Sequence, residues 1–157
     1  MKAKNQKCAE AQMLIRKPAK IVFSAFIDPS ITTHFWFTKS SGRLDQNKKV
    51  TWEWEMYHVS TTVTVKEIVQ NEKINFEWGD PARTVEFKFE SLSEDSTYVS
   101  VRESGYDKTG DDLLEVIKDS TGGFTTVLDG LKAFLEYGIN LNLIADKFPA
   151  TSIRHGN

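Results

Sequence analysis

The hydrophobic positions of the chain follow two periods: every second residue in the middle, and every third or fourth residue near its two ends. The longest helical pattern covers residues 122–143, where the apolar side chains share one helical face. Thr125, Asp129, Lys132 and Glu136 fall on other faces, where we expect them to contact water. At about 1.5 Å per residue, the stripe predicts a helix roughly 20–25 Å long that needs a partner surface. The stripe consists of Phe124, Val127, Leu128, Leu131, Phe134, Leu135 and Gly138.

Alternating apolar and polar residues predict that partner surface, a sheet of about six strands. Residues 9–16 form the first expected strand, and the others lie at 50–55, 59–65, 74–78, 85–90 and 99–103. Turns are predicted at 71–72, at Gly79-Asp80-Pro81 and at 93–96. Because consecutive strands are joined by short connections, we expect an antiparallel meander rather than a parallel sheet with crossovers.

Two small helices are predicted after the first strand. Pro18 suits the start of a helix over 19–27, and Asp28-Pro29 ends it. Ser30 is the expected N-cap of a second helix over 30–37. The apolar positions of the first helix are Ile21, Val22, Ala25 and Phe26.

Further helical structure is expected to begin at Asp111-Asp112, before the long helix. Gly122-Gly123 is expected to interrupt or bend it, because glycine weakens a helix. The first eight residues and the tail from Asp146 are expected to be loosely held.

Composition narrows the class of protein. The 157 residues, 39% hydrophobic with 10 Phe and 4 Trp, predict one folded domain over 1–157 with an ordered core at about 9–144. A net charge of −2 without a basic stripe argues against nucleic acid as a partner. The single cysteine, Cys8, excludes an internal disulfide and fits a reducing compartment, so we expect a cytoplasmic protein. No stretch approaches the ~18 apolar residues of a membrane span.

Several segments resemble one family. RKPAKIVFSAFIDPSITTHFWF resembles its opening strand, helix and turn, and VTVKEIVQNEKINFEW resembles its central hairpin. VSVRESGY and GGFTTVLDGLKAFLEYGINL resemble its "E-x-G" strand end and its closing helix. Over roughly residues 9–144 the chain is similar to the activator of heat-shock protein 90 ATPase homologue-like family of the START-like (SRPBCC) superfamily. Two positions differ: Phe124 and Phe23 stand where the family usually has Trp.

The resemblance implies an α+β helix-grip fold, in which a curved antiparallel sheet wraps around the last helix and two small helices close one end. It often implies a deep apolar cavity between the sheet and the helix. Members bind lipids, polyketides, flavonoid-like aromatics or nothing known. Many are described only from the chaperone activator, which implies a link to the stress response.

Aromatic side chains on the inner face of the sheet are the first candidate site. Trp52 and Trp54 share one strand face, as do Phe76 and Trp78, so they could form an aromatic wall for a flat apolar ligand. The alternative is that these side chains simply fill the core. The expected lining is Trp36, Trp52, Trp54, Phe76, Trp78, Phe87 and Val101 on the sheet side, and Phe124, Leu128 and Leu131 on the helix.

Glu103 is the expected polar group of this site. It has the parity of Val99 and Val101 and therefore points toward the helix if the strand stays regular. A desolvated carboxyl group there could orient a hydroxylated ligand or act as an acid or base. The alternative is a bulge near Gly105 that turns Glu103 into solvent. Tyr106 is a possible hydroxyl partner.

Other chemistry has little support in the sequence. His34, His58 and His155 lack the spacing of zinc ligands, so no metal is expected. His34 could gate the pocket, and the alternative is a surface histidine. Glu53 and Glu55 suggest a solvated strand edge. No phosphate-loop, dinucleotide or nucleophile-elbow motif occurs, so no cofactor is predicted.

These observations leave three functions, in this order of preference. The first is binding of a small hydrophobic ligand without catalysis. The second is an interaction module whose outer sheet or helix end binds a chaperone. The third is a cyclase or dehydratase that uses Glu103 with Tyr106. We expect a monomer or weak dimer.

Overall fold

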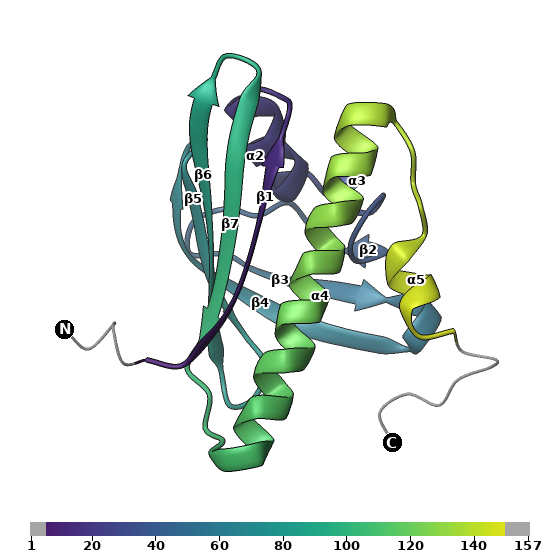
Figure 1. Ribbon diagram of the computed structural model, residues 1–157. Helices are drawn as coiled ribbons and strands as arrows, with labels where there is room; N and C mark the ends of the chain where they lie inside the picture. The colour runs from purple at the N-terminus through teal and green to yellow at the C-terminus, as the bar shows by residue number, and fades with distance from the viewer. Residues whose placement is uncertain (1–5, 150–157) are drawn as a thin grey trace.

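Seven strands form one curved antiparallel sheet in the computed structural model, which describes residues 6–149 (Figure 1). The strands are β1 (Cys8–Ile15), β2 (Lys39–Ser40), β3 (Lys49–Trp54), β4 (Val59–Val69), β5 (Lys73–Trp78), β6 (Arg83–Ser93) and β7 (Ser96–Ser104). Their order across the sheet is β1-β7-β6-β5-β4-β3-β2. The predicted meander is therefore confirmed, with β1 placed beside the last strand and the two-residue β2 as an addition to the six strands expected.

The helices are α2 (Ala19–Ile27), α3 (Pro29–Thr32), η1 (Glu55–Tyr57, a 3-10 turn), α4 (Gly110–Tyr137) and α5 (Leu143–Lys147). The bounds of α2 are those predicted. The second small helix is shorter than the expected 30–37, and its N-cap is Asp28 rather than Ser30. The carboxylate of Asp28 accepts hydrogen bonds from the Ser30 N–H at 3.0 Å and the Ser30 hydroxyl at 2.8 Å. These bonds hold the pKa of Asp28 below its ordinary value.

The inner face of α2 differs from the prediction at one position. Val22, Ala25 and Phe26 are buried, but Ile21 is 44% exposed. The actual buried face continues through Phe23, which packs edge-to-face on Phe89 of β6 at 5.5 Å between ring centroids. The helix thus covers β6 with its phenylalanines and leaves Ile21 outside.

One continuous helix, α4, replaces the two helical segments that the sequence suggested. The expected interruption at Gly122-Gly123 is wrong, since both glycines lie within the helix. The helix ends where the apolar stripe ends, at Gly138. Gly138 adopts a left-handed conformation (φ 68°), and its N–H donates to the Phe134 carbonyl while that of Ile139 donates to Ala133. This arrangement ends the helix at Tyr137.

One residue on the polar side of α4 departs from expectation, because the side chain of Glu136 is buried. Its side chain is 7% exposed and accepts hydrogen bonds from Lys132 Nζ and from the Arg16 N–H, both at 2.7 Å. Lys132 Nζ also donates to the carbonyl of Leu14 at 2.9 Å. These contacts fasten the second half of α4 to the free edge of β1.

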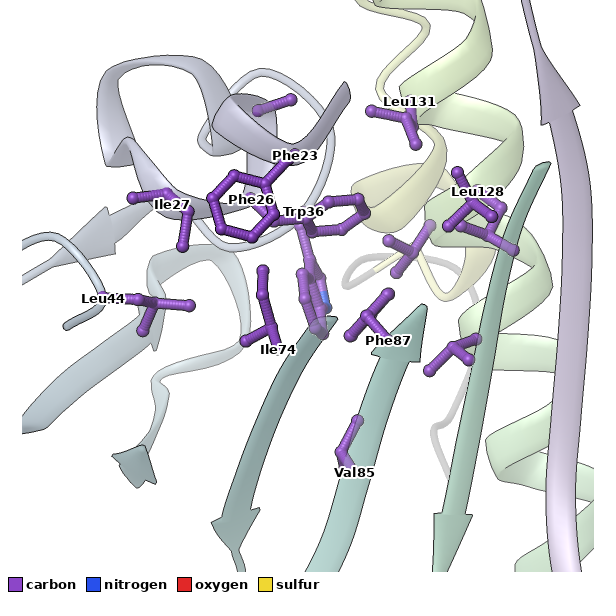
Figure 2. Close-up of a cluster of buried hydrophobic side chains, with 14 of the residues drawn as sticks. Phe23, Phe26, Ile27, Trp36, Leu44, Ile74, Val85, Phe87, Leu128 and Leu131 are labelled. Atoms are coloured by element: carbon purple, nitrogen blue, oxygen red, sulfur yellow. The ribbon is translucent and has the colours of Figure 1, made fainter. Parts of the chain in front are cut away.

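The core lies between the sheet, α2, α3 and the second half of α4. Figure 2 shows Trp36 at its centre, with Phe26 on one side and Leu128 and Leu131 of α4 on the other. Leu128 and Leu131 are fully buried. This packing orients α4 across the sheet.

The last described segment, 138–149, returns along α4 and contains the short helix α5, which the sequence did not predict. The hydroxyl of Tyr57 donates to the carbonyl of Ile144 and so ties α5 to η1. The rest of the tail that was expected to be loosely held, residues 150–157, lies outside the described residues, and so does His155. Within residues 6–149, no helix combines the length and the apolar character needed to cross a membrane.

Candidate functional site

The predicted aromatic wall is brought together, and most of it is buried. Trp54 and Trp78, at the ends of β3 and β5, are only half-buried. The other apolar members of the predicted lining are 6% exposed or less: Trp36, Trp52, Phe76, Phe87, Val101, Phe124, Leu128 and Leu131.

The buried rings touch one another directly. Trp36 lies 4.9 Å from Trp52, 5.9 Å from Phe87 and 6.2 Å from Phe124, measured between ring centroids. Phe37, which the sequence analysis left out of the wall, stacks on Trp52 at 4.4 Å. Side chains therefore occupy this part of the space between sheet and helix.

Two surface hollows lie elsewhere, with volumes of about 210 and 450 Å³. The first, on the outer face of the sheet, is lined by polar residues such as Glu10, Glu86 and Arg102. The second lies beside Glu53, Glu55 and His58. Val101 is the one member of the predicted lining that borders either hollow.

Glu103 points inward, because β7 stays regular to its end. Glu103 is paired with Ala9 on one side and Val85 on the other, and the pairing continues to Ser104. The alternative of a bulge near Gly105 is therefore excluded. The residue is 1% exposed, a charged group among apolar neighbours.

Four side chains surround the carboxylate of Glu103, and we call these five residues the Glu103 network. Oε2 accepts a hydrogen bond from Trp78 Nε1 at 2.8 Å. Oε1 accepts from the Ser120 hydroxyl at 2.6 Å and the Tyr106 hydroxyl at 3.1 Å. The Arg83 guanidinium lies 3.9 Å from Oε1 and 5.3 Å from the centroid of the Tyr106 ring. A buried carboxylate needs such partners, since an unpaired one is costly.

The network also fixes the chemistry of Tyr106. Burial and the neighbouring charge of Glu103 both raise the pKa of the Tyr106 hydroxyl. Tyr106 therefore stays protonated near neutral pH and acts as a hydrogen-bond donor rather than a base. In this structure the carboxylate of Glu103 is therefore an acceptor surrounded by two hydroxyl donors and an indole N–H.

Sequence reasoning found Glu103 and Tyr106 but missed Arg83 and Ser120. Signals for both were present. Arg83 has the parity of Val85 on β6, and Ser120 lies one helical turn before Phe124 on the same face of α4. Extending these periods places both residues on inward faces, but it does not show that either one reaches Glu103.

The network lies next to apolar side chains that are incompletely covered. Leu113, Val116 and Ile117 precede Ser120 on the same face of α4, and all three are only half-buried. Trp78, which donates to Glu103, is half-buried as well. The Glu103 end of the sheet–helix interface therefore combines a buried polar group with partly open apolar walls.

The remaining candidates lie apart from this site. His34 is exposed and stacks on Phe134 at 4.4 Å between ring centroids. Glu55 and His58 border the second surface hollow. Among residues 6–149, no group of three or more His, Cys, Asp or Glu side chains could hold a metal ion.

Solved structures with this fold come from several organisms. A protein from Staphylococcus saprophyticus is 27% identical, with a TM-score of 0.76 over 86% of this chain and 96% of that one. An Hsp90 activator from Plasmodium falciparum is 20% identical, with a TM-score of 0.64 over 82% and 95% of the two chains. A START superfamily protein from Mycobacterium smegmatis is 14% identical, with a TM-score of 0.62 over 82% and 98%. The last two similarities establish the fold.

The sequence itself carries the family assignment. No curated protein matches the chain. The family model described as "Activator of Hsp90 ATPase homolog 1-like protein" matches residues 16–136, from the end of β1 to the last turn of α4. This range contains the sheet apart from β1, the Glu103 network and the buried face of α4. The chain therefore belongs to the activator of Hsp90 ATPase homolog 1-like family and has the START-like helix-grip fold.

Proposed function

We propose that the protein binds a small hydrophobic molecule at the Glu103 end of the sheet–helix interface. The observation that carries this proposal is the buried carboxylate of Glu103 beside half-covered apolar side chains of α4. Ligand sites combine mostly apolar walls with a few polar groups that fix orientation, and this end of the interface has both. The interlocked rings around Trp36 form the closed floor of the site.

The strength of such binding depends on how much apolar surface the ligand buries. Burying ~300 Å² of ligand apolar surface at about 25 cal/mol/Å² contributes several kcal/mol of binding free energy. The translational and rotational entropy lost on association is subtracted from this value. That is enough for affinity of the micromolar class. A tighter complex requires the polar group of the ligand to match the Glu103 network.

Trp78 provides the test, because its indole is half-buried and bonded to Glu103. Titration with a panel of fatty acids, flavonoids and polycyclic phenols is expected to shift tryptophan emission and raise the melting temperature. In Trp78→Phe the emission change is expected to shrink while the thermal shift persists. Flat emission and unchanged melting across the whole panel would contradict the proposal.

A second candidate is a chaperone-associated module, which the family membership favours. Its structural support is an exposed apolar strip at the end of α4 and just beyond it, formed by Tyr137 (71% exposed), Ile139 (49%) and Leu141 (49%). Exposed apolar side chains close together are typical of partner surfaces.

The test uses purified Hsp90. If the strip is the contact surface, the wild-type chain binds Hsp90 and stimulates its ATPase, and the triple variant Tyr137→Ser, Ile139→Ser, Leu141→Ser does neither. The Ile21→Ser variant is a matched control, since Ile21 is 44% exposed on the remote helix α2. Absence of binding by the wild-type chain would exclude this candidate and leave the ligand proposal intact.

A further inference from the structure

The two halves of α4 are packed differently. Every buried residue of the helix comes after Gly123: Phe124, Val127, Leu128, Gly130 and Leu131. Before Gly122, the apolar residues Leu113, Val116 and Ile117 are half-buried, and Leu114 is 67% exposed. Figure 1 shows these first turns of α4 below the end of β7, with the later turns running up across the sheet. The first half of α4 (110–121) is thus held by far less buried surface than the second half (124–137).

The glycine pair between the halves is not required by packing. A Cβ atom at Gly123 would meet nothing within 4 Å, and one at Gly122 would meet only the flexible Nζ of Lys147 at 3.6 Å. Gly130 differs, because a Cβ there would lie 3.1 Å from Cβ of Phe35. Each glycine inside a helix weakens it by about 1 kcal/mol relative to alanine. Two adjacent glycines without a steric reason make this the weakest point of α4.

One side-chain hydrogen bond fastens the first half of α4 to the sheet at the site. The Ser120 hydroxyl donates to Glu103 Oε1 at 2.6 Å, the shortest bond of the Glu103 network. Ser120 lies two residues before the glycine pair. A swing of the first half of α4 at the glycines that breaks this bond leaves Oε1 with one of its two hydroxyl donors, Tyr106.

We infer that the first half of α4 is a lid that swings at Gly122-Gly123, and that the ligand places a neutral hydroxyl group where the Ser120 hydroxyl now lies. The apolar body of the ligand then packs beneath Leu113, Val116 and Ile117, whose cover it completes. This inference rests on the proposed function, and it specifies the ligand class: a hydroxylated apolar molecule.

The electrostatics of the network favour a neutral donor. The Glu103 carboxylate only accepts hydrogen bonds, so a ligand acceptor or anion is repelled. The Arg83 guanidinium at 3.9 Å already offsets the carboxylate charge. A cationic ligand would therefore lose its hydration and gain little electrostatic attraction in return. A hydroxyl group reproduces the Ser120 bond without adding charge.

Hydrogen exchange tests the hinge without any ligand. In the wild-type protein, amides of residues 114–121 are expected to exchange faster than those of 128–137. Replacing both Gly122 and Gly123 by alanine should slow exchange in the first half of α4. Asp129→Ala is the control, because it adds helix propensity at an exposed position of the second half and should leave residues 114–121 unchanged. Equal exchange in the two halves, or no effect of the double substitution, would overturn the hinge.

Three related probes test the ligand class: 2-naphthol, its methyl ether and naphthalene, titrated against tryptophan emission. We expect 2-naphthol to bind about tenfold more tightly than the other two, because only it donates a hydrogen bond. Ser120→Ala should tighten 2-naphthol binding several-fold by removing its competitor, while Glu103→Gln should reduce the preference for 2-naphthol. Thr121→Ala, also half-buried, is the matched control for Ser120→Ala.

The outcomes separate this inference from the proposed function. Similar affinities for the three probes would overturn the hydroxyl assignment while leaving hydrophobic binding in place. Binding by none of them, together with a flat response to the wider panel, would contradict the proposed function and the ligand class together. The exchange experiment decides the hinge in either case.

Discussion

The side chain of Glu103 is ionisable and buried, and four neighbouring side chains take the place of water around its carboxylate. Trp78 and Ser120 each supply a donor to a different carboxylate oxygen, and Tyr106 adds a second hydroxyl. Hydrogen bonds to a charged group contribute more than neutral ones, about 1.5–3 kcal/mol each. The carboxylate therefore joins β5, β6, β7 and α4 at a single point.

Glu103→Gln is expected to lower the free energy of unfolding by about 1–2 kcal/mol, because an amide has nearly the same shape but weakens the charge-assisted bonds. Urea unfolding at pH 7 measures the change. Glu90→Gln, an exposed position of β6, is the control and should differ from wild type by less than about 0.5 kcal/mol. A Gln variant as stable as wild type would show that the network contributes no net stability.

At the residue scale, the sequence predicts which way a side chain points better than it predicts which side chains it contacts. The parity of Val99, Val101 and Glu103 predicted the inward carboxyl group, because a regular strand alternates its faces. The donors on it could not be predicted in the same way, since Ser120 and Trp78 reach it through the relative placement of α4 and β5. Glu136 shows the same limit, since helical period alone put it in water, whereas the edge of β1 buries it.

Among the elements, α4 serves three roles along its length. Its first half covers the Glu103 network, its middle packs on the core, and its last turns are fastened to β1 through Lys132 and Glu136. Gly130 in the middle permits a close approach to Phe35, whose carbonyl would lie 3.4 Å from an added Cβ.

Gly130→Ala is expected to lower the thermal midpoint, because the new methyl group crowds Phe35 and overpacking costs about 1–3 kcal/mol. Gly123→Ala, seven residues earlier, is the control and should raise the midpoint, since its Cβ would occupy open space. Differential scanning calorimetry compares the two variants. Equal midpoints would contradict the close approach at Gly130.

Glu136 should make stability depend on pH. Burial by itself raises the pKa of its carboxyl group, but the bonds from Lys132 and the Arg16 N–H outweigh it and hold the pKa below the ordinary 4.5. A carboxyl group whose pKa is lower in the folded state stabilises the fold above its unfolded value and loses that contribution as the pH falls through the folded value.

Glu136→Gln should therefore reduce the urea midpoint at pH 7, with the difference from wild type shrinking steadily as the pH falls below about 4.5. Chemical unfolding across a pH series makes the measurement. Glu115→Gln, which removes an exposed pair with Lys118, is the control and should show little change at any pH. A difference that is independent of pH would mean that the charge of Glu136 is not what matters.

At the scale of elements, the effect of glycine on a helix was the least predictable feature. Gly122-Gly123 was expected to interrupt or bend the helix, yet the helix is not interrupted, because the residues on both sides keep the same face toward the sheet. Gly138 ends the helix although it fitted the apolar period, because its backbone takes a left-handed conformation. A glycine spaced with apolar residues is thus compatible with either outcome until packing decides.

For the whole molecule, alternation and helical period predicted an antiparallel sheet packed on a long helix, because each element has one face that must be buried. The family resemblance added the helix-grip arrangement of the two. Whether a cavity remains depends on side-chain volumes across the sheet, and here Trp36, Trp52 and Phe37 fill the centre. The period of a strand says which residues point inward but not how closely they meet. This is why the lining residues could be predicted and the space between them could not.

The sheet offers little edge for pairing with a second copy, so we expect a monomer of 17.9 kDa at micromolar concentration. One edge strand, β2, has only two residues, and the other, β1, is partly covered by α4 through Lys132. Light scattering coupled to size exclusion measures the mass. A stable dimer would show instead that another surface, such as the strip at Tyr137, is covered by a second copy.

The pairing of β1 with β7 has a consequence for synthesis. Ala11 of β1 pairs with Val101 of β7, so β1 has no sheet partner until all the strands between them, and β7 itself, have left the ribosome. α4, which packs on the same strand, emerges later still. The nascent chain must therefore carry an apolar strand and the phenylalanines of α2 uncovered through most of translation, when aggregation competes with folding.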